Sequence, residues 1–420
     1  MPTIKHNRKF KYIILGAGPS GLSFANKLLQ LGEDSFLVID KESEPGGLCR
    51  SQIVDGSPLD IGGGHFLDVK RKEVLDFVFK FLPNEEWNEF NRISKIRLKD
   101  FEIDYPFESN IWQFPTDIQI EYIISIAKAG CQTGKAMPEG FQEWIRWKLG
   151  DKIAEKYMIP YNNKIWSNGL DSLGTYWLHK LPNASLRDIL LSCLEKKPSG
   201  TIPAHAKFLY PKKGGYGKVW KLMANNINDK ILFNIKVNDI DFNNLVVNKS
   251  FYAEKIIMTI PWTEISESSL PKDIRYSINK LEFISIETAY CDNTQETEAH
   301  WIYIPDESIS YHRIVNRFNF CPNARGYWTE TNTKRIAPNN HWSYINKYAY
   351  PLNTVKKPDA IKNIVKWAAA KGVYGLGRWG KWEHMNSDVC IQEAINLARR
   401  LVSQNKENEN ENHTLFTDLG

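Results

Sequence analysis

The sequence lacks the features of a secreted, metal-binding or membrane-embedded protein. It has only six cysteines in 420 residues, and they lie far apart, with neither a Cys-x-x-Cys pair nor a histidine spacing suited to zinc. We therefore expect reduced thiols, no metal site and a cytoplasmic location. The basic start lacks the apolar stretch of a signal peptide, and no apolar run reaches the roughly 18 residues of a membrane span. We expect no membrane insertion.

The sequence also lacks any segment in which charges of one sign are concentrated. The 54 lysines and arginines exceed the 49 acidic residues by five, and the surplus is spread along the chain. Because no basic block is present, we expect no nucleic-acid partner, and any anion site must be local. With 42% hydrophobic and 25% charged residues, the composition is that of a globular protein of two or three domains. It leaves open whether the chain forms homo-oligomers.

The first 40 residues have the pattern of a βαβ unit. Phe10–Leu15 is an apolar run typical of a buried parallel strand, and Ser20–Leu31 has the periodicity of an amphipathic helix. Ser35–Asp40 is a second apolar run. The pattern predicts an α/β protein that begins with a Rossmann-type unit.

A glycine fingerprint lies between the first strand and the helix. Gly16, Gly18 and Gly21 form Gly-x-Gly-x-x-Gly, which permits a tight turn, a close approach of backbone to a pyrophosphate, and packing of helix on strand. The helix N-terminus supplies free N–H groups for the phosphates. Asp40 ends the second strand, where a carboxylate accepts hydrogen bonds from an adenosine ribose and disfavours a 2′-phosphate. The fingerprint therefore predicts FAD or NAD rather than NADP.

Two more glycine clusters favour FAD. Gly46 and Gly47 follow soon after Asp40, and Gly63 and Gly64 come next, which indicates backbone pressed against an extended cofactor. Such glycine pairs near the ribose acid recur in flavoproteins that include amine oxidases, protoporphyrinogen oxidases and sugar-nucleotide mutases. We predict bound FAD, with NADH or NADPH as its reductant.

The rest of the chain predicts a helical insertion and a second sheet. Residues 116–150 have helical periodicity, whereas residues 205–262 alternate short β runs, including Lys230–Val237 and Lys255–Ile260. A helix should follow Pro358, and a last helix should cover about Val389–Val402. The predicted organisation is a FAD-binding core over 1–100, a helical substrate-side insertion over 101–200, a mixed sheet domain over 201–370 that is largely antiparallel, a return to the core over 371–403, and a disordered tail over 404–420.

Six later stretches give the chain a specific resemblance. It resembles the UDP-galactopyranose mutase family, in particular its longer eukaryotic-type enzymes, from about Phe10 to Val402. The stretches are Arg92-Ile93-Ser94 with Asp104-Tyr105-Pro106-Phe107, Phe141-Gln142-Glu143-Trp144, Pro160–Trp166, Gly214-Gly215-Tyr216-Gly217, Trp301–Pro305 with Tyr311-His312-Arg313, and Gly377-Arg378-Trp379-Gly380. The resemblance implies a flavin-dependent enzyme that interconverts the pyranose and furanose forms of a UDP-sugar, UDP-galactose or a related sugar, through a covalent adduct with reduced FAD and without net redox.

The resemblance also implies roles for individual residues. Arg313 would grip the diphosphate as a catalytic cation, and His65 and Arg92 would lie at the flavin. Arg378 and Asn386 would bind the flavin end of FAD. The substrate residues would be Tyr105, Phe107, Asn162 and Trp166 for uridine, Tyr303 and Tyr350 for the diphosphate, and His205 and His384 at the sugar and phosphates.

Departures from the family concentrate at the sugar and diphosphate. A second diphosphate arginine is usual where this chain has Leu181, unless Lys180 replaces it. His205 stands where an asparagine is common, His384 where a tyrosine is usual, and Glu108 where a glutamine near uracil is expected. The expected activity could therefore act on a sugar other than galactose.

Two other classes remain open on the sequence. A substrate-oxidising flavoprotein such as an amine oxidase or protoporphyrinogen oxidase shares the first 65 residues but does not need Tyr105, Trp166 and Arg313 together. A flavin-bound protein with a structural or binding role is the third. A uridine site would separate the mutase from both.

Overall fold

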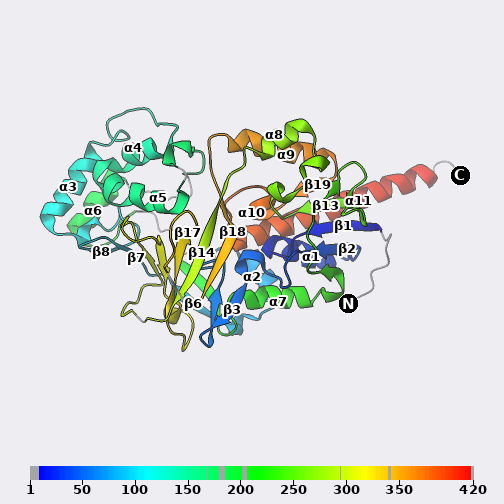
Figure 1. Cartoon of the computed structure of the whole chain (residues 1–420), viewed down its shortest axis with the longest axis horizontal. Helices are drawn as coiled ribbons and strands as arrows, with labels where there is room; N and C mark the ends of the chain where they lie inside the picture. The colour runs from blue at the N-terminus through cyan, green and yellow to red at the C-terminus, as the bar shows by residue number, and fades with distance from the viewer. Residues whose placement is uncertain are drawn as a thin grey trace.

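The computed structural model describes residues 9–167, 169–178, 185–200, 206–293, 295–338 and 342–417. The molecule is elongated, with a group of helices at one end, a helix-covered parallel sheet at the other, and a large mixed sheet between them (Figure 1). Within these residues, no helix has the length and apolar character needed to cross a membrane.

A mainly parallel sheet contains the predicted βαβ unit. Its order is β10-β2-β1-β13-β12-β11, with β19 also paired to β13. β1 pairs in parallel with both β2 and β13, so the first strand lies in the middle of the sheet. The strands are β1 (Lys9–Leu15), β2 (Phe36–Ile39), β10 (Ile231–Leu232), β11 (Ile240–Asp241), β12 (Val246–Val247), β13 (Phe251–Met258) and β19 (Val373–Gly375).

Helices from both ends of the chain cover this sheet. α1 (Pro19–Gln30) begins just after Gly18, with proline in its first turn, and it packs against α11 (Ser387–Thr417) and α7 (Gly217–Asn225). Leu22, Ala25 and Leu28 follow helical spacing and are fully buried. The other helices of this part are α2 (Lys72–Val78), α8 (Lys272–Ile278), α9 (Lys357–Ala370) and α10 (Gly377–Gly380).

The large mixed sheet has the order β18-β14-β17-β16-β15-β7-β8. Only β15 and β7 pair in parallel, and Arg313 on β16 lies opposite Tyr303 on one side and Glu330 on the other. The predicted boundary at residue 100 falls inside the β7–β8 hairpin, which belongs to this sheet. Its strands are β7 (Ser94–Arg97), β8 (Glu102–Asp104), β14 (Phe283–Cys291), β15 (Trp301–Tyr303), β16 (Arg313–Val315), β17 (Tyr327–Asn332) and β18 (Ser343–Pro351).

Two small sheets connect the parts. The β3–β4 hairpin (Ser51–Val54 and Ser57–Asp60) joins the two later glycine clusters, and the buried Arg317 donates to the carbonyls of Val54 (2.9 Å) and Ser57 (3.1 Å). The second sheet has the order β5-β9-β6, formed by Leu67–Asp68, Lys207–Pro211 and Trp87–Asn91.

The predicted helical insertion lies at one end of the molecule. α3 (Thr116–Ala127), α4 (Phe141–Ile153), α5 (Ile159–Trp166) and α6 (Leu186–Glu195) surround a separate aromatic-rich core. A π-helical turn over Ala154–Met158 joins α4 to α5. The boundaries of all five predicted domains remain predictions.

One local expectation was wrong. In the predicted strand Lys230–Val237 only Ile231 and Leu232 pair, because the chain turns at Asn234 (φ 61°). The N–H of Ile235 instead donates to the carbonyl of Asp40 (2.9 Å), which places this segment over the end of β2.

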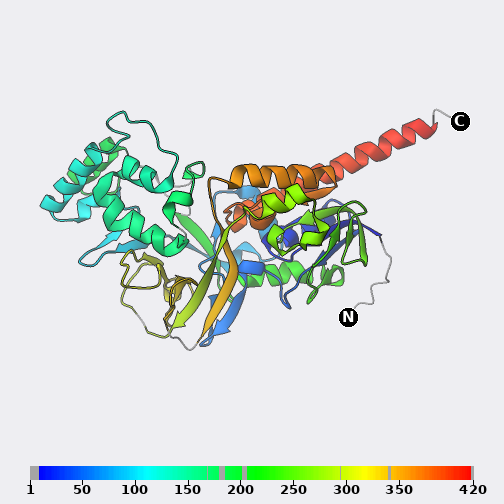
Figure 2. The same ribbon diagram turned by 45° about the horizontal axis from the view of Figure 1, so that its top comes forward.

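The last helix, α11, continues to Thr417, into the predicted tail, and it projects beyond the body of the molecule (Figure 2). Asn405 holds it to the sheet by donating to the Tyr12 hydroxyl (2.8 Å).

Candidate functional site

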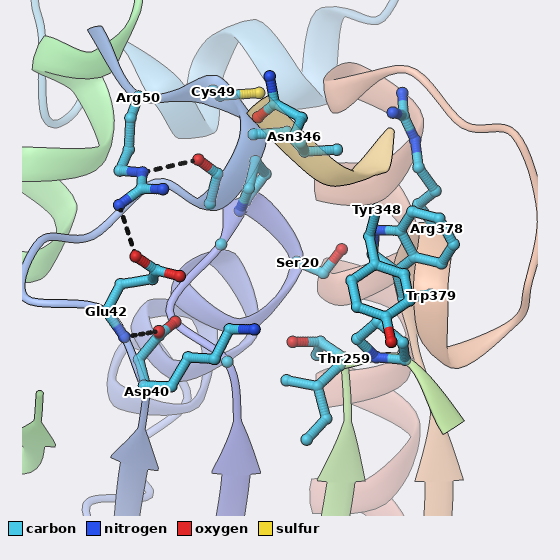
Figure 3. A pocket seen from close by; sticks show the side chains of 18 of the residues that line it. Ser20, Asp40, Glu42, Cys49, Arg50, Thr259, Asn346, Tyr348, Arg378 and Trp379 are labelled. Carbon is cyan, nitrogen blue, oxygen red and sulfur yellow. Dashed lines mark hydrogen bonds and ion pairs between the residues drawn. The ribbon is translucent and has the colours of Figure 1, made fainter. Parts of the chain in front are cut away.

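A long cavity lies at the carboxyl ends of β1, β2 and β13 (Figure 3). In an open parallel sheet this is the edge at which dinucleotides bind. Its walls include Gly16, Gly18, Asp40, Gly47 and Arg378 of the predicted cofactor set, together with His65 of the predicted catalytic set. Two glycines of the fingerprint and one glycine of the next cluster therefore line one cavity.

Asp40 fastens the glycine loop at one end of the cavity. Its carboxylate accepts from the N–H of Ala17 (2.6 Å) and from the N–H of Glu42 (2.8 Å). Burial raises the pKa of Asp40, and the two amide donors partly offset this effect. Each oxygen retains a lone pair that can receive a ribose hydroxyl.

The glycines leave no room for side chains. A Cβ atom at Gly21 would lie 1.9 Å from the carbonyl oxygen of Gly16, and one at Gly16 would lie 2.5 Å from Oγ1 of Thr259. A Cβ at Gly47 would lie 3.3 Å from the Cα of Gly18, so two backbone segments meet here. Gly46, with φ 110°, donates its N–H to the carbonyl of Ala17 (2.8 Å). The loops thus form a cradle of bare backbone.

His65 lies at the other end of the cavity. Its Nδ1 is 2.9 Å from the carbonyl oxygen of Gly63, and the side chain is half-buried. Burial and the nearby Arg378 cation lower the pKa of His65 to about 3, so the imidazole is neutral at physiological pH. A Cβ at Gly63 would lie 2.6 Å from Oε1 of Glu330, and one at Gly64 would lie 3.0 Å from Nε1 of Trp301.

Arg378 joins this end of the cavity to the mixed sheet. Its guanidinium donates to the carbonyls of Met385 (2.7 Å) and Ala349 (2.8 Å), and its Cζ lies 5.3 Å from the ring centroid of Tyr350. Asn386 is exposed, although its neighbours Met385 and Ser387 line the cavity. Its predicted contact with the cofactor stays a prediction.

A cationic and aromatic cluster lies on the mixed sheet. Arg92 donates to the Tyr303 hydroxyl (2.5 Å) and to Oγ of Ser94 (2.8 Å), and its Cζ lies 5.4 Å from the ring centroid of Tyr105. Tyr105 and Tyr303 have their ring centroids 5.1 Å apart. Four residues predicted for substrate or flavin therefore gather at one part of the mixed sheet. Tyr303 is on β15 and Arg313 on β16, whereas Arg92 lies just before β7 and Tyr105 just after β8.

Arg313 is a half-buried cation on β16. Its guanidinium pairs with Glu330. Burial alone would lower the pKa of Arg313, but Glu330 and the nearby hydroxyls of Tyr350, Tyr161 and Tyr303 raise it well above its usual value. Its Nε is buried and has no hydrogen-bond partner among the residues that the structure describes. The cluster therefore offers an unused donor for an oxyanion.

The predicted uridine residues of α5 are bonded to each other. Nε1 of Trp166 donates to Oδ1 of Asn162 (2.9 Å), and Nδ2 of Asn162 donates to the carbonyl of Met158 (2.7 Å). Phe107 is 0% exposed, and its ring lies among Phe114, Tyr122 and Tyr157.

Other aromatic side chains therefore surround the Phe107 ring, and its predicted contact with uridine stays a prediction. Glu108 is also buried, which raises its pKa to about 7.

Two predicted residues at the sugar side meet within the structure. Tyr350 and His384 have ring centroids 4.9 Å apart, and Tyr350 lies edge-on to Trp166 (6.4 Å). The predictions for His205, Lys180 and Leu181 fall outside the described residues.

Sequence reasoning missed Glu330 and Arg50. Glu330 is 1% exposed and pairs with Arg313. Arg50 donates to the carbonyl of Gly47 (3.1 Å), pairs with Glu42 (3.1 Å) and donates to the Tyr344 hydroxyl (2.8 Å). No motif marked Glu330, whereas the position of Arg50, three residues after Gly47, was a signal that could have been used.

Comparisons with known proteins agree with this geometry. A family model described as an NAD(P)-binding Rossmann-like domain matches residues 14–81. UDP-galactopyranose mutase of Mycoplasma pneumoniae is 21% identical over 96% of this chain and 98% of that protein. dTDP-fucopyranose mutase of Escherichia coli is also 21% identical, over 94% of this chain and all of that protein.

Solved structures give the same result for the fold. A crystal structure of reduced UDP-galactopyranose mutase matches with a TM-score of 0.82 at 20% identity, over 94% of each chain. Cyclohexylamine oxidase from Brevibacterium oxydans matches with a TM-score of 0.64 at 14% identity, over 94% of this chain and all of that chain. The predicted fold class is confirmed, as is the resemblance: the chain is a homologue of UDP-galactopyranose mutase and dTDP-fucopyranose mutase along nearly its whole length, and it has the UDP-galactopyranose mutase fold.

Proposed function

We propose that the protein is an FAD-dependent isomerase that interconverts the pyranose and furanose forms of a nucleoside diphosphate sugar. The observation that carries the proposal is Arg313, a half-buried cation that lies opposite Tyr303, pairs with Glu330 and has a donor without a partner among the described residues. Glu330 in turn lies 3.4 Å from the backbone nitrogen of Gly64, beside His65 of the dinucleotide cavity. The full-length relatives named as mutases of UDP- and dTDP-linked sugars support it.

The cavity fits a bound FAD. Asp40 has lone pairs for the adenosine ribose, and the bare backbone at Gly18 and Gly47 leaves room for a pyrophosphate at the N-terminus of α1. α1 has no side-chain cap, so its first N–H groups are available to phosphate oxygens. At the far end, neutral His65 and the fixed guanidinium of Arg378 would face the flavin ring.

Reduced FAD would supply the nucleophile that displaces the nucleoside diphosphate from the sugar, and we expect NADH or NADPH to reduce it. The protein would provide the remaining functions. Arg313 and Tyr303 would hold the diphosphate while it leaves, and Asn162 and Trp166 would hold the base. The surrounding aromatic side chains would exclude water that could hydrolyse the adduct.

A UDP-sugar is the substrate class that the uridine motifs favour. The two relatives act by name on UDP-galactopyranose and dTDP-fucopyranose, and both nucleotides are pyrimidine diphosphates. His384 lies against Tyr350, so the site carries an imidazole at a position where the resemblance expects a tyrosine. The names of the two relatives support galactose or a related sugar, and the changed position at His384 favours a relative of galactose.

The oxidase alternative has weaker support. The amine oxidase structure matches less closely, with a TM-score of 0.64 against 0.82 for the mutase structure. An amine oxidase also has no use for the Arg313 cation, because its amine substrate is itself cationic.

The test is turnover without net redox. The purified FAD protein, reduced once with dithionite and kept anaerobic, should interconvert UDP-galactopyranose and UDP-galactofuranose over many turnovers with no further reductant. The unreduced protein is the matched control and should be inactive. One oxidised product per flavin, with peroxide formed in air, would instead establish an oxidase.

A further inference from the structure

Glu330 on β17 connects the two halves of the proposed site. Oε2 pairs with Arg313, and the same oxygen lies 3.7 Å from Nε2 of His312. Oε1 lies on the opposite side, 3.4 Å from the backbone nitrogen of Gly64 in the turn that precedes His65. One buried carboxylate therefore contacts both the diphosphate cation and the loop at the flavin.

Arg313 is only partly committed to this pair. Its Nε has no partner among the described residues, yet it is buried. An oxyanion bound by this donor, beside Tyr303 on the neighbouring strand, would share the guanidinium with Glu330. Two anions that share one cation compete for it, because each lowers the attraction that the other receives.

Resting on the proposed function, we propose that Glu330 is a positioning residue that competes with the diphosphate for Arg313. In the bound substrate the phosphate charge is spread over several oxygens, and the carboxylate keeps part of the guanidinium. As the bond to the sugar breaks, the leaving oxygen gains charge and draws Arg313 toward itself. The cation then binds the transition state more tightly than the substrate, which is the condition for catalysis.

The Gly63–Gly64 turn can receive the released carboxylate. The N–H of Gly64 is at the long limit of a hydrogen bond to Oε1, so it can tighten when Arg313 turns away. A Cβ at Gly63 would lie 2.6 Å from that oxygen, which explains why glycine is needed beside it. Glu330 thus exchanges one partner for another and does not become an unpaired buried charge.

Glu330→Gln distinguishes competition from simple support, because the two predict opposite signs. With the FAD protein, calorimetric titration should show UDP binding roughly five- to thirtyfold more tightly than to wild type, as removal of one nearby charge implies. Uridine has no phosphates and should bind as it does to wild type. The kcat of the reduced enzyme should fall about tenfold. The variant should therefore bind its ligand more tightly and yet turn over more slowly, so KM and kcat should both be lower than in wild type.

Weaker or unchanged UDP binding in Glu330→Gln would overturn the proposal, because a purely structural role weakens every ligand. If that variant loses FAD, Glu330→Asp retracts the carboxylate by one methylene and should also bind UDP more tightly, to a smaller extent. Glu287→Gln on the neighbouring strand β14 is the matched control and should behave as wild type. Wild-type protein that binds neither UDP nor uridine would refute the proposed function itself.

Discussion

The indole N–H of Trp166 donates to the side-chain oxygen of Asn162 at 2.9 Å, one turn away on the same helix. Asn162 also donates to the carbonyl of Met158, so half of its hydrogen-bonding capacity is used inside α5. Its remaining N–H and lone pair are held in one orientation. The pair therefore presents a fixed amide to a base instead of a freely rotating one.

Trp166→Phe tests this arrangement, because it keeps an aromatic ring and removes only the indole N–H. We expect UDP affinity to fall roughly fivefold, the usual cost of about 1 kcal/mol for one neutral hydrogen bond. FAD content should not change. Trp112→Phe, which removes an indole N–H bonded to Asn110, is the control. Unaltered UDP binding in Trp166→Phe would show that the pair does not orient the base.

Asp40→Ala should weaken retention of FAD. It removes a carboxylate that holds the N–H of Ala17 and offers lone pairs to the ribose, and a hydrogen bond to a charged group contributes about 1.5–3 kcal/mol. The dissociation constant should therefore rise roughly 10- to 100-fold, as measured by flavin fluorescence after dilution. Asp76→Ala, an exposed residue of α2, is the control. A variant that retains FAD as wild type does would place the adenosine elsewhere.

Arg313→Ala should lower turnover by roughly 30- to 1000-fold, the range expected when a charge-assisted contact to the leaving group is lost. FAD content should remain normal, because Arg313 does not line the dinucleotide cavity. Arg313→Lys should recover only part of the rate, since an ammonium lacks the guanidinium fork. Near-normal turnover with full FAD would mean that another cation holds the diphosphate.

The buried Lys164 on α5 predicts a stability that rises with pH. Its ammonium donates to the carbonyls of Ile304 and Asp306, both at 2.7 Å, and burial lowers its pKa to about 7. Between pH 7 and the unfolded value near 10.5 the unfolded chain binds more protons, so unfolding becomes harder as pH rises. The slope is at most about 1.4 kcal/mol per pH unit.

Urea unfolding of wild type and Lys164→Met at pH 7 and pH 9 measures how much Lys164 contributes to the pH dependence of the unfolding free energy. The difference in unfolding free energy between the two proteins should grow in favour of wild type at pH 9. Other titrating groups cancel in that difference. A gap that stays constant or shrinks would show that the amine keeps its ordinary protonation when folded.

The sequence predicted the fold of the Rossmann-type unit well, because local rules define it. The spacing of Gly16, Gly18 and Gly21 is typical of one strand–turn–helix geometry, and the position of Asp40 follows from the end of the second strand. Residues of the diphosphate cluster were identified only through a resemblance, since Arg92, Tyr303 and Arg313 meet by long-range strand pairing. Glu330 was missed because a lone acidic residue in a strand has no local signature. The packing of Phe107 against Tyr122 and Tyr157 could not be predicted, because it depends on contacts between separate segments of the chain.

The dinucleotide cavity is built from segments that are widely separated in the chain, and this affects the newly made protein. Its walls combine the glycine loop at residue 16 with Arg378 and Cys390 near the end. A ribosome must therefore synthesise the chain as far as Cys390 before the cofactor can be enclosed. Truncation anywhere before α11 should yield a chain that has its fingerprint but cannot retain flavin, so flavin content reports on whether synthesis reached α11.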